Sequence, residues 1–422
     1  EIYINIQIKM KNIIFFLYII LFNYSTTHSQ TYNSNNVSYS PYNNKVSTLI
    51  FLTKVKNISI SSPDSALLIY KSMLKELPSV FSKNQDSLNY YFLRAKILTE
   101  ISSIYINFKS EFDKALEYSE EAKKTFNSFL LVINDIDFKN EIKSEIGACN
   151  INIGKIYEKR GLFLIAIDYY ITSLKIYSEL NNEIKVANCY LSIGGINDFI
   201  GDYDKAKEYY DLALNIFEKN FLENEMAECY YNIGLNFEEQ ENRDSASFYY
   251  QKSLNLYKKL GNKYGIGLSF FGIGSTYVFY DDFFDKEKAV IYYTKALDIF
   301  ISIGDKFNIS EVQSCMSLLF NKIKQFDTAK FYALKALKIA EELKSTYLSC
   351  YPYKSLSDAY GGLGEISLSY KYYKMYKENI DYLYGGENNK VCIEASVKES
   401  LFSFSNEIQK EKELFQKKII FI

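Results

Sequence analysis

Three cysteines recur at a fixed interval and are the first candidates for chemistry in this chain. Cys149, Cys189 and Cys229 lie 40 residues apart, at the same place in a repeat. Equivalent positions in stacked repeats are about 8–10 Å apart, beyond the roughly 7 Å Cα limit for a disulfide. We therefore interpret them as small buried apolar residues and not as a redox centre. The other cysteines show no metal-ligand spacing: Cys315, Cys350 and Cys392.

The single histidine, His28, lies in a segment that we expect to be removed. A mature chain without histidine has no Ser–His or Cys–His pair and no histidine-containing zinc site. Gly154-Lys155 is followed by Ile and not by Ser or Thr, so the phosphate-binding loop pattern is not met. A paired-carboxylate site stays open, because acidic residues are abundant, but no pair stands out. We predict no enzyme activity, no cofactor and no metal.

Charge and composition limit the partners and the architecture. Lys and Arg number 49 against 51 Asp and Glu, the net charge is -2, and both signs are interspersed along the chain. A nucleic-acid partner is not expected, because neutralising phosphates requires a basic face. With 4 Pro, 18 Gly and 48% apolar residues in 422, the composition favours long helices and no linker between globular domains.

The N-terminal residues are typical of an export signal. In residues 1–29 the start falls at Met10, Lys11 supplies a positive charge, and Ile13–Phe22 is an apolar run of ten residues, too few to span a bilayer. Small residues flank His28, where cleavage is expected. An exported, periplasmic protein follows, the alternative being an uncleaved N-terminal anchor. Residues 30–44 are polar and predict a flexible spacer.

The other end predicts an extended linking helix over residues 387–418, followed by residues 419–422 as the start of an interrupted membrane segment or as a short apolar C-terminus. Within 391–418 the apolar spacing of three and four indicates a coiled-coil-like helix that can form a homodimer. Membrane anchorage at the C-terminus is the corresponding expectation. The apolar positions are Ile393, Val397, Leu401, Phe404, Ile408 and Phe415, interrupted at Glu411.

Self-similarity is the strongest signal in the sequence. Each repeat carries a glycine in one segment, and an alanine, a tyrosine and a leucine in the next. The spacing i, i+4, i+8 of the last three places them on one helix face, with the alanine where two helices approach closely. The glycines are Gly154, Gly194, Gly234 and Gly274; the alanines are Ala166, Ala206, Ala246 and Ala289; the tyrosines are Tyr170, Tyr210, Tyr250 and Tyr293; the leucines are Leu174, Leu214, Leu254 and Leu297.

Turn residues separate the two segments of each repeat: Gly161, Gly201-Asp202, Glu241-Asn242 and the longer Tyr280–Glu287. The last turn adds three residues, so the alanine interval becomes 43 there while the upstream glycine interval stays 40. A solenoid tolerates such an insertion because it is confined to a surface turn. Spacing also stretches between Lys123 and Ser144, which predicts a helix extension or a loop near residues 133–138.

These segments resemble tetratricopeptide repeats, whose units are helix-turn-helix with a small residue in the first helix and an alanine beside an aromatic residue in the second. The resemblance is clearest over residues 144–306 and extends to 45–386 through weaker units. It implies an all-α, right-handed α-solenoid of about seven or eight units. The period of about 40 residues exceeds the family's usual ~34, which implies longer helices.

The resemblance also implies that the first helices line a concave groove, where residues beside the glycines are candidates for binding a peptide or protein. Both charge signs and aromatic rings occur there, which suits a protein segment. For each residue an ordinary packing or solvated role stays open. The candidates are Lys155, Glu158, Lys159, Asp198, Phe199, Tyr231, Glu238, Glu239, Phe271, Phe279, Asn321 and Lys322.

Tyrosine doublets accompany the repeats and raise the question of carbohydrate or base stacking. We favour a packing role, because one tyrosine of each doublet is at the packing position and the other, about 100° around the helix, can lie against the next unit. The doublets are 169–170, 209–210, 249–250, 292–293 and 372–373.

Two functions follow from these expectations. The first is an exported scaffold that binds a protein or peptide partner in its groove. The second is the sensor region of a longer membrane signalling protein, because a signal peptide, repeats, a linking helix and an apolar end resemble the front part of bacterial histidine kinases and transcriptional regulators that carry such repeats. In that case the output domain lies beyond Ile422.

Overall fold

The computed structural model describes residues 52–56, 58–59, 62–77 and 85–384. The predicted signal peptide, the spacer, the linking helix of 387–418 and the end at 419–422 lie outside the described residues. From Val55 onward the described chain belongs to one unit, to which the following description applies. Within the described residues no helix is both long and apolar enough to cross a membrane.

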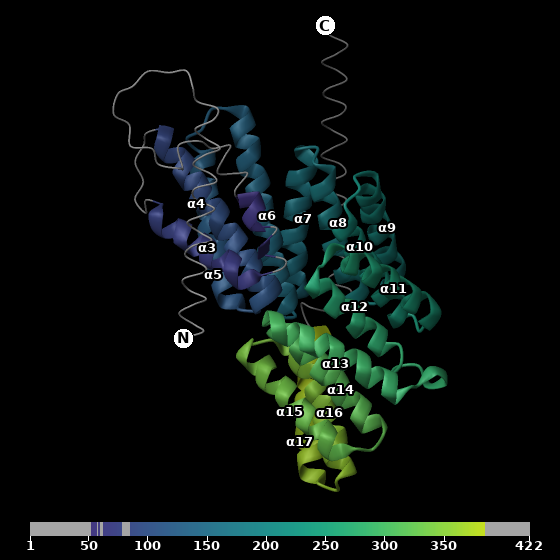
Figure 1. The fold of residues 1–422 in the computed structure, drawn as a ribbon. Helices are drawn as coiled ribbons and strands as arrows, with labels where there is room; N and C mark the ends of the chain where they lie inside the picture. Colours follow the sequence, from purple (N-terminus) through teal and green to yellow (C-terminus); the bar gives the residue numbers. More distant parts are fainter. Residues whose placement is uncertain (1–51, 57, 60–61, 78–84, 385–422) are drawn as a thin grey trace, which may run out of the picture. The chain divides into compact units, whose positions relative to one another are not determined.

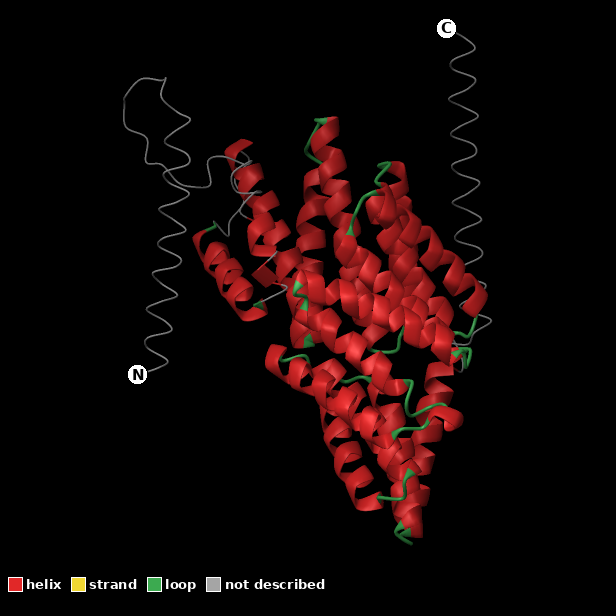
Figure 2. Cartoon of the chain, turned by 45° about the vertical axis from the view of Figure 1, so that its right-hand side comes forward, coloured by secondary structure: helices red, strands yellow, loops and turns green. Residues whose placement is uncertain are grey.

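Helices joined by short loops make up this unit, and its described residues contain no strand (Figure 2). Each helix packs on the next along the chain, and seven helix pairs from α4/α5 to α16/α17 confirm the all-α solenoid (Figure 1). In order, the helices are α3 (Pro63–Glu76), α4 (Gln85–Ile104), the π-helical η2 (Tyr105–Lys109), α5 (Phe112–Leu130), α6 (Ile136–Lys159), α7 (Phe163–Glu179), α8 (Glu183–Phe199), α9 (Tyr203–Lys219), α10 (Glu223–Glu239), α11 (Arg243–Leu260), α12 (Lys263–Ser275), α13 (Lys286–Ile303), α14 (Lys306–Lys322), α15 (Phe326–Glu342), α16 (Thr346–Gly362) and α17 (Ile366–Tyr384).

From α7 to α12 a new helix begins every 20 residues, which is half of the sequence repeat. Most turns contain one residue in the left-handed region, which reverses the chain, and in many of them a capping side chain follows it; the α5–α6 loop and the longer α12–α13 turn contain none. Gly161 and Gly201 take this conformation without a Cβ penalty, and Asp202 then accepts a hydrogen bond from the amide of Lys205. The left-handed residues are Ser110, Gly161, Asn181, Gly201, Phe221, Glu241 and Gly261, then Gly304, Lys324, Lys344 and Gly364.

The irregular turns lie where the spacing changes. Between α12 and α13 the three extra residues form part of a longer turn that contains a short 3-10 helix, η3 (Asp281–Phe283), which confirms the predicted insertion. Upstream, both a loop at 131–135 and an extended α6 of 24 residues account for the stretched interval.

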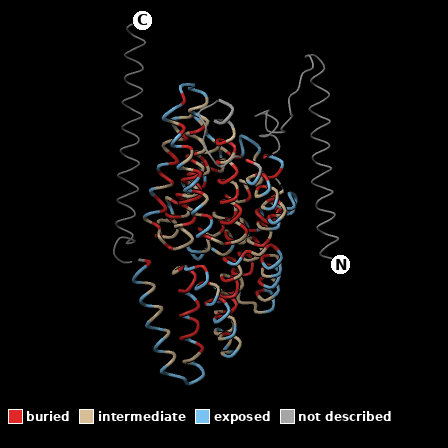
Figure 3. Tube along the Cα trace, turned by 90° about the vertical axis from the view of Figure 1, so that its left-hand side faces the viewer, coloured by how far each residue is buried: buried red, intermediate tan, exposed pale blue. Residues whose placement is uncertain are grey.

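Packing between paired helices depends on the glycine and the tyrosine of each repeat. The tyrosine ring lies so close to the glycine that a Cβ on Gly194 would meet the Tyr210 ring at 2.6 Å, and a Cβ on Gly154 would meet the Tyr170 ring at 2.5 Å. All four repeat alanines and all four packing tyrosines are buried, as predicted. Buried positions recur along the helices (Figure 3), and clusters of buried apolar residues follow one another along the stack.

The cysteines are confirmed as packing residues. Cys149, Cys189 and Cys229 are buried and free, and burial raises the pKa of the Cys149 and Cys189 thiols to about 12. A thiol with such a pKa stays protonated and is a poor nucleophile. Cys392 lies outside the described residues.

The other tyrosine of each doublet, one position before the packing position, lies against an aromatic ring of the first helix of its own unit or of the turn that follows that helix. Tyr249 stacks on Phe237 at 5.6 Å between ring centroids, and Tyr292 stacks on Tyr277 at 5.9 Å. The expectation that this tyrosine lies against the next unit is replaced by contact within the unit. In the last doublet Tyr373 is 51% exposed, because no described helix covers α17.

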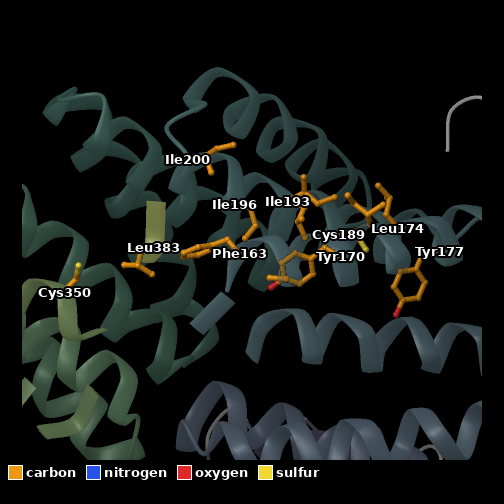
Figure 4. Close-up of a cluster of buried hydrophobic side chains, with 13 residues drawn as sticks. Phe163, Tyr170, Leu174, Tyr177, Cys189, Ile193, Ile196, Ile200, Cys350 and Leu383 are labelled. Atoms are coloured by element: carbon orange, nitrogen blue, oxygen red, sulfur yellow. The ribbon is translucent and has the colours of Figure 1, made fainter. Parts of the chain in front are cut away.

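Contacts between distant parts of the sequence supplement the stacking of neighbours. Lys344, before α16, pairs with Asp113 of α5 at 2.9 Å, and Ser110 donates a hydrogen bond to Asp305, before α14, at 3.1 Å. In the apolar cluster around α7 and α8, Leu383 lies beside Phe163 and Cys350 belongs to the same cluster (Figure 4). The last helix pairs therefore contact the α5 and α6–α7 region.

Candidate functional site

A ladder of carboxyl and tyrosine side chains runs along the first helices. In three successive units the residue four positions after the glycine is acidic and accepts a hydrogen bond from the hydroxyl of the packing tyrosine. The distance is 2.7 Å from Tyr210 to Asp198, which also accepts from the Asn236 amide. The three pairs are Tyr170 with Glu158 at 2.5 Å, Tyr210 with Asp198, and Tyr250 with Glu238 at 2.5 Å.

Burial shifts the ionisation of this ladder. It raises the pKa of Asp198 to about 6 and that of Glu238 to about 8, although the tyrosine hydroxyls oppose the shift by donating hydrogen bonds. Burial also raises the pKa of Tyr210 and Tyr250 well above 10, so both hydroxyls stay protonated as donors. Glu238 is therefore mostly neutral near pH 7, whereas Asp198 is mostly charged.

The ladder ends at the fourth unit. Val278 is at the position equivalent to Glu238, and the hydroxyl of Tyr293 contacts the hydroxyl of Ser275 at 3.2 Å. The acidic residue is thus replaced in the unit that also carries the longer turn. The carboxyl ladder is confined to α6, α8 and α10.

A polar cavity of about 200 Å³ lies on the first helices upstream of the ladder. It is lined from α4 by Glu100, from α6 by Asn152 and Lys155, and from α8 by Lys185 and Asn188, among others. Lys56 also lines it and pairs with Glu100 at 3.0 Å. Donors and acceptors of both signs converge there, which is typical of a site for a polar segment of a partner.

Two lysines of this cavity lack an ionic partner. Among the described residues, neither Lys155 nor Lys185 has a carboxylate within ion-pair distance of its ammonium group. Burial lowers the pKa of Lys185, with the nearby Lys56 ammonium acting in the same direction and Glu145 and Glu100 opposing it. Partly buried cations without partners favour an anionic ligand group, since it would offset their desolvation.

Two other predicted groove residues are occupied by contacts with the last helices. The Lys159 ammonium lies 3.8 Å from the ring centroid of Phe307, and the carbonyl of Lys159 accepts a hydrogen bond from Ser345. Phe199 stacks on Phe163 with centroids 3.5 Å apart and lies 6.5 Å from Tyr347. These side chains hold the α14 and α16 ends against the α6–α8 region.

The remaining candidates are dispersed among several environments. Tyr231 is buried against Tyr250, and Phe271 packs at 5.8 Å from Tyr293. Glu239 is exposed, yet desolvation by the surrounding chain raises its pKa, and Phe279 is half exposed. Asn321 donates to the backbone and hydroxyl of Ser355, and Lys322 pairs with Asp281 at 2.6 Å. The structure therefore does not gather all twelve candidates into one site; their role in binding stays a prediction.

Sequence reasoning missed most of the cavity. Asn152, Lys185 and Asn188 were not among the candidates, although Asn152 and Ser192 occupy equivalent positions two residues before their glycines. The pairing of each acidic residue with a tyrosine 12 residues later was also missed. Aligning the repeats column by column would have found both signals.

Metal-binding residues do not cluster in the part of the chain that the structure describes. No group of three or more His, Cys, Asp or Glu there is arranged to hold a metal ion. The ladder and the cavity are thus arrangements of hydrogen-bonding and charged groups.

Comparison with known proteins agrees with this architecture. The tetratricopeptide repeat family model matches residues 146–219 and 200–259, which fall on three of the seven described helix pairs, α6/α7, α8/α9 and α10/α11. Residues 146–259 therefore contain tetratricopeptide repeats, and the helix pairs on either side continue the same helical solenoid. A search of curated proteins finds none that matches it.

Solved structures similar to this chain include a Rap protein complexed with competence and sporulation factor, with a TM-score of 0.56, 14% identity, and coverage of 89% of this chain and 99% of that one. NprR in complex with its cognate peptide NprX gives a TM-score of 0.56 at 14% identity, covering 90% and 100%. The Rap conjugation gene regulator of the plasmid pLS20, in complex with a peptide, gives 0.55 at 16%, covering 75% and 83%. At these identities the likeness concerns the fold.

Proposed function

We propose that this chain is a non-enzymatic scaffold that binds a peptide or a protein segment along its first helices. The polar cavity between α4, α6 and α8 anchors the ligand through an acidic group. The observation that carries the proposal is the pair of partly buried lysines, Lys155 and Lys185, which lack carboxylate partners within the described chain.

The size and the chemistry of the cavity support a segment of a larger ligand. About 200 Å³ is smaller than the ~300–1,000 Å³ usual for a drug-sized ligand, so the cavity suits a few side chains of a longer partner. Asn152 and Asn188 offer both donors and acceptors, which can pair with the backbone of a peptide. Peptides bound to two proteins of similar fold support the same ligand class.

The test is the selection of peptides from a random display library on the purified chain, followed by fluorescence anisotropy with one selected peptide. Lys155→Glu combined with Lys185→Glu should weaken binding at least tenfold, because two charge-assisted contacts of about 1.5–3 kcal/mol each become repulsive. Binding that falls by less than twofold would remove the cavity from the proposal.

A matched control separates loss of contact from loss of charge. Lys175→Glu with Lys207→Glu makes the same change in net charge on α7 and α9, the second helices of two units. This control should bind the selected peptide as the unchanged chain does. If both double variants weaken binding equally, long-range charge and not the cavity determines affinity.

We further propose that the protein is exported to the periplasm, with Lys11 and the apolar run of Ile13–Phe22 as the supporting sequence feature. The alternative, a sensor region of a membrane signalling protein with a C-terminal anchor, has its support in Lys417-Lys418 followed by an apolar stretch. Reporter fusions after residue 44 and after residue 422 test export and anchorage separately, and the coding frame beyond residue 422 tests the sensor alternative. Dimerisation through 391–418 is tested by sedimentation of the full chain.

A further inference from the structure

One outward-facing position of the second helices is acidic in the first units of the stack and apolar in the later units. The residue two positions after the buried alanine lies 200° around the helix and so faces away from the first helix. In α7 and α9 this residue is Asp168 and Glu208. In α11, α13 and α15 it is Phe248, Ile291 and Phe331, which are 56%, 51% and 51% exposed.

One turn further along the same faces, a lysine accompanies each exposed apolar residue. Lys252, Lys295 and Lys335 are at the position occupied by Thr172 and Leu212 in α7 and α9. All three are exposed, and within the described chain none of them has a carboxylate within ion-pair distance.

Aromatic rings hold these three ammonium groups in place. Lys252 lies 4.7 Å from the Phe248 ring centroid, and Lys335 lies 4.1 Å from that of Phe331. Lys295 lies 5.3 Å from the Tyr292 ring. Each contact stabilises the position of the charge by about 0.5–1 kcal/mol at an exposed site, without neutralising it.

The rings beneath are themselves fixed by stacking. Tyr249 stacks on a ring of α10, Tyr292 stacks on the ring of Tyr277 just after α12, and Tyr332 of α15 stacks on Phe320 of α14 at 5.6 Å. Lys258 of α11 and Lys295 of α13 both lie 5.5 Å from the ring of Phe270 in the intervening helix α12. The surface is thus preorganised, which lowers the entropy lost on binding.

We propose that the outward sides of α11, α13 and α15 form a second docking surface, which binds an acidic protein segment with apolar side chains. Phe248, Ile291 and Phe331 supply apolar contacts, and Lys252, Lys295 and Lys335 supply complementary charge. The surface lies on the second helices and is distinct from the cavity of the first helices.

The composition of this surface favours a protein segment over other polyanions. Ile291 offers no ring for a nucleic-acid base, and the faces of Phe248 and Phe331 are partly covered by lysines. Asp298 and Asp327 belong to the same helices and oppose a continuous phosphate backbone or an anionic membrane. An acidic segment with apolar side chains matches the pattern of isolated charges beside isolated apolar residues.

The test uses a fluorescein-labelled synthetic peptide in which Glu alternates with Phe and Leu, titrated with the full chain. Lys252→Glu, Lys295→Glu and Lys335→Glu combined should weaken binding at least tenfold. Phe248→Ala with Phe331→Ala should weaken it severalfold at unchanged charge. Lys175→Glu, Lys207→Glu and Lys219→Glu on α7 and α9 form the control, with the same change in net charge and no expected loss.

Two comparisons decide the result. Labelled oligodeoxythymidine and phosphatidylserine vesicles should bind more weakly than the peptide, and tighter binding of either would overturn the choice of a protein segment. The proposal of a second docking surface would be overturned if the peptide did not bind. It would also be overturned if the peptide bound the combined Lys252→Glu, Lys295→Glu, Lys335→Glu variant as well as the unchanged chain. The Lys155→Glu, Lys185→Glu variant distinguishes the two surfaces: binding of this peptide that falls in this variant and not in the variant of Lys252, Lys295 and Lys335 would assign the peptide to the cavity and overturn the second surface.

Discussion

The contacts within the units from α6 to α13 are periodic, whereas the contacts that the last helix pairs make with distant helices are not. Within the units, a 40-residue period places the same residue types at the same contacts, such as Gly194 against Tyr210 and Gly234 against Tyr250. The contacts of α14, α16 and α17 with α5–α8 are not periodic and join residues up to 231 positions apart, as in Lys344 with Asp113. Neighbour packing builds the stack, whereas single residues join its distant parts.

This difference concerns how stability is distributed. In an ideal solenoid each repeat contacts only its neighbours, so stability is a sum of local terms. Ser110, Lys159 and Phe163 break that rule by contacting residues before or within the last helix pairs. The two regions should therefore unfold with more coupling than an open array of repeats.

Removing one aromatic residue from the distant contacts should have the largest effect. Phe307 is buried and packs between Phe112 and Tyr347, with Lys159 over its ring. Phe307→Ala should lower the free energy of unfolding by about 3–5 kcal/mol, because the cavity left behind cannot fully collapse. Chemical denaturation followed by circular dichroism measures this loss.

Phe217→Ala is the matched control, since Phe217 is fully buried in α9 and contacts only the periodic part of the core. Its cost should be similar. Only Phe307→Ala should speed hydrogen exchange at residues 108–113, where the distant contacts begin. Equal exchange in both variants would mean that the last helix pairs do not protect that segment.

The periodic part was readable from the sequence because its contacts repeat. The interval of the glycines predicted the helix pairs, and the alanine, tyrosine and leucine spacing predicted the buried face, including the three-residue insertion in one turn. The left-handed conformation of Phe221 and Lys344 was not predicted, because neither residue type favours it and only the packing of the neighbouring helices imposes it.

The candidate site was only partly predictable for a related reason. Lys155 was chosen from its place beside a glycine, and it does line the polar cavity, yet Lys185 enters that cavity from the next unit and has no local signal. Lys159 and Phe199 have the same sequence context as binding residues, but the last helices contact them. Only the three-dimensional path of the chain distinguishes a free groove residue from one used internally.

A smaller effect is expected from the carboxyl ladder, which belongs to the periodic region but differs between units. The pKa of Glu238 is raised to about 8 in the folded chain, from 4.5, so the folded state binds more protons than the unfolded state between these values. Stability should therefore fall as the pH rises through that window. Allowing for residual exposure, the loss between pH 5 and pH 8 is about 2 kcal/mol.

Glu238→Gln removes the charge and keeps an acceptor for Tyr250, so unfolding curves of this variant should lose that pH dependence. Asp198→Asn should instead remove the pH dependence of stability between pH 3.8 and about pH 6, since the pKa of Asp198 is raised less than that of Glu238. A variant of Glu238 that retains the full pH dependence would show that another group titrates. If Glu238 and Asp198 affect stability over separate pH ranges, the degree of burial differs between equivalent positions of the repeat.

The smallest effect separates close packing from helix propensity within a single turn of α8. A Cβ on Gly194 would meet the Tyr210 ring at 2.6 Å, whereas a Cβ on Gly195 meets only the Tyr210 hydroxyl oxygen at 3.9 Å. Gly194→Ala should destabilise the chain by about 1–3 kcal/mol through overpacking, and Gly195→Ala should stabilise it by about 0.5–1 kcal/mol through helix propensity. Thermal unfolding of both variants gives the two signs. If they agree in sign, the glycine interval reflects helix propensity and not the approach of the tyrosine ring, and the periodic region loses its physical cause.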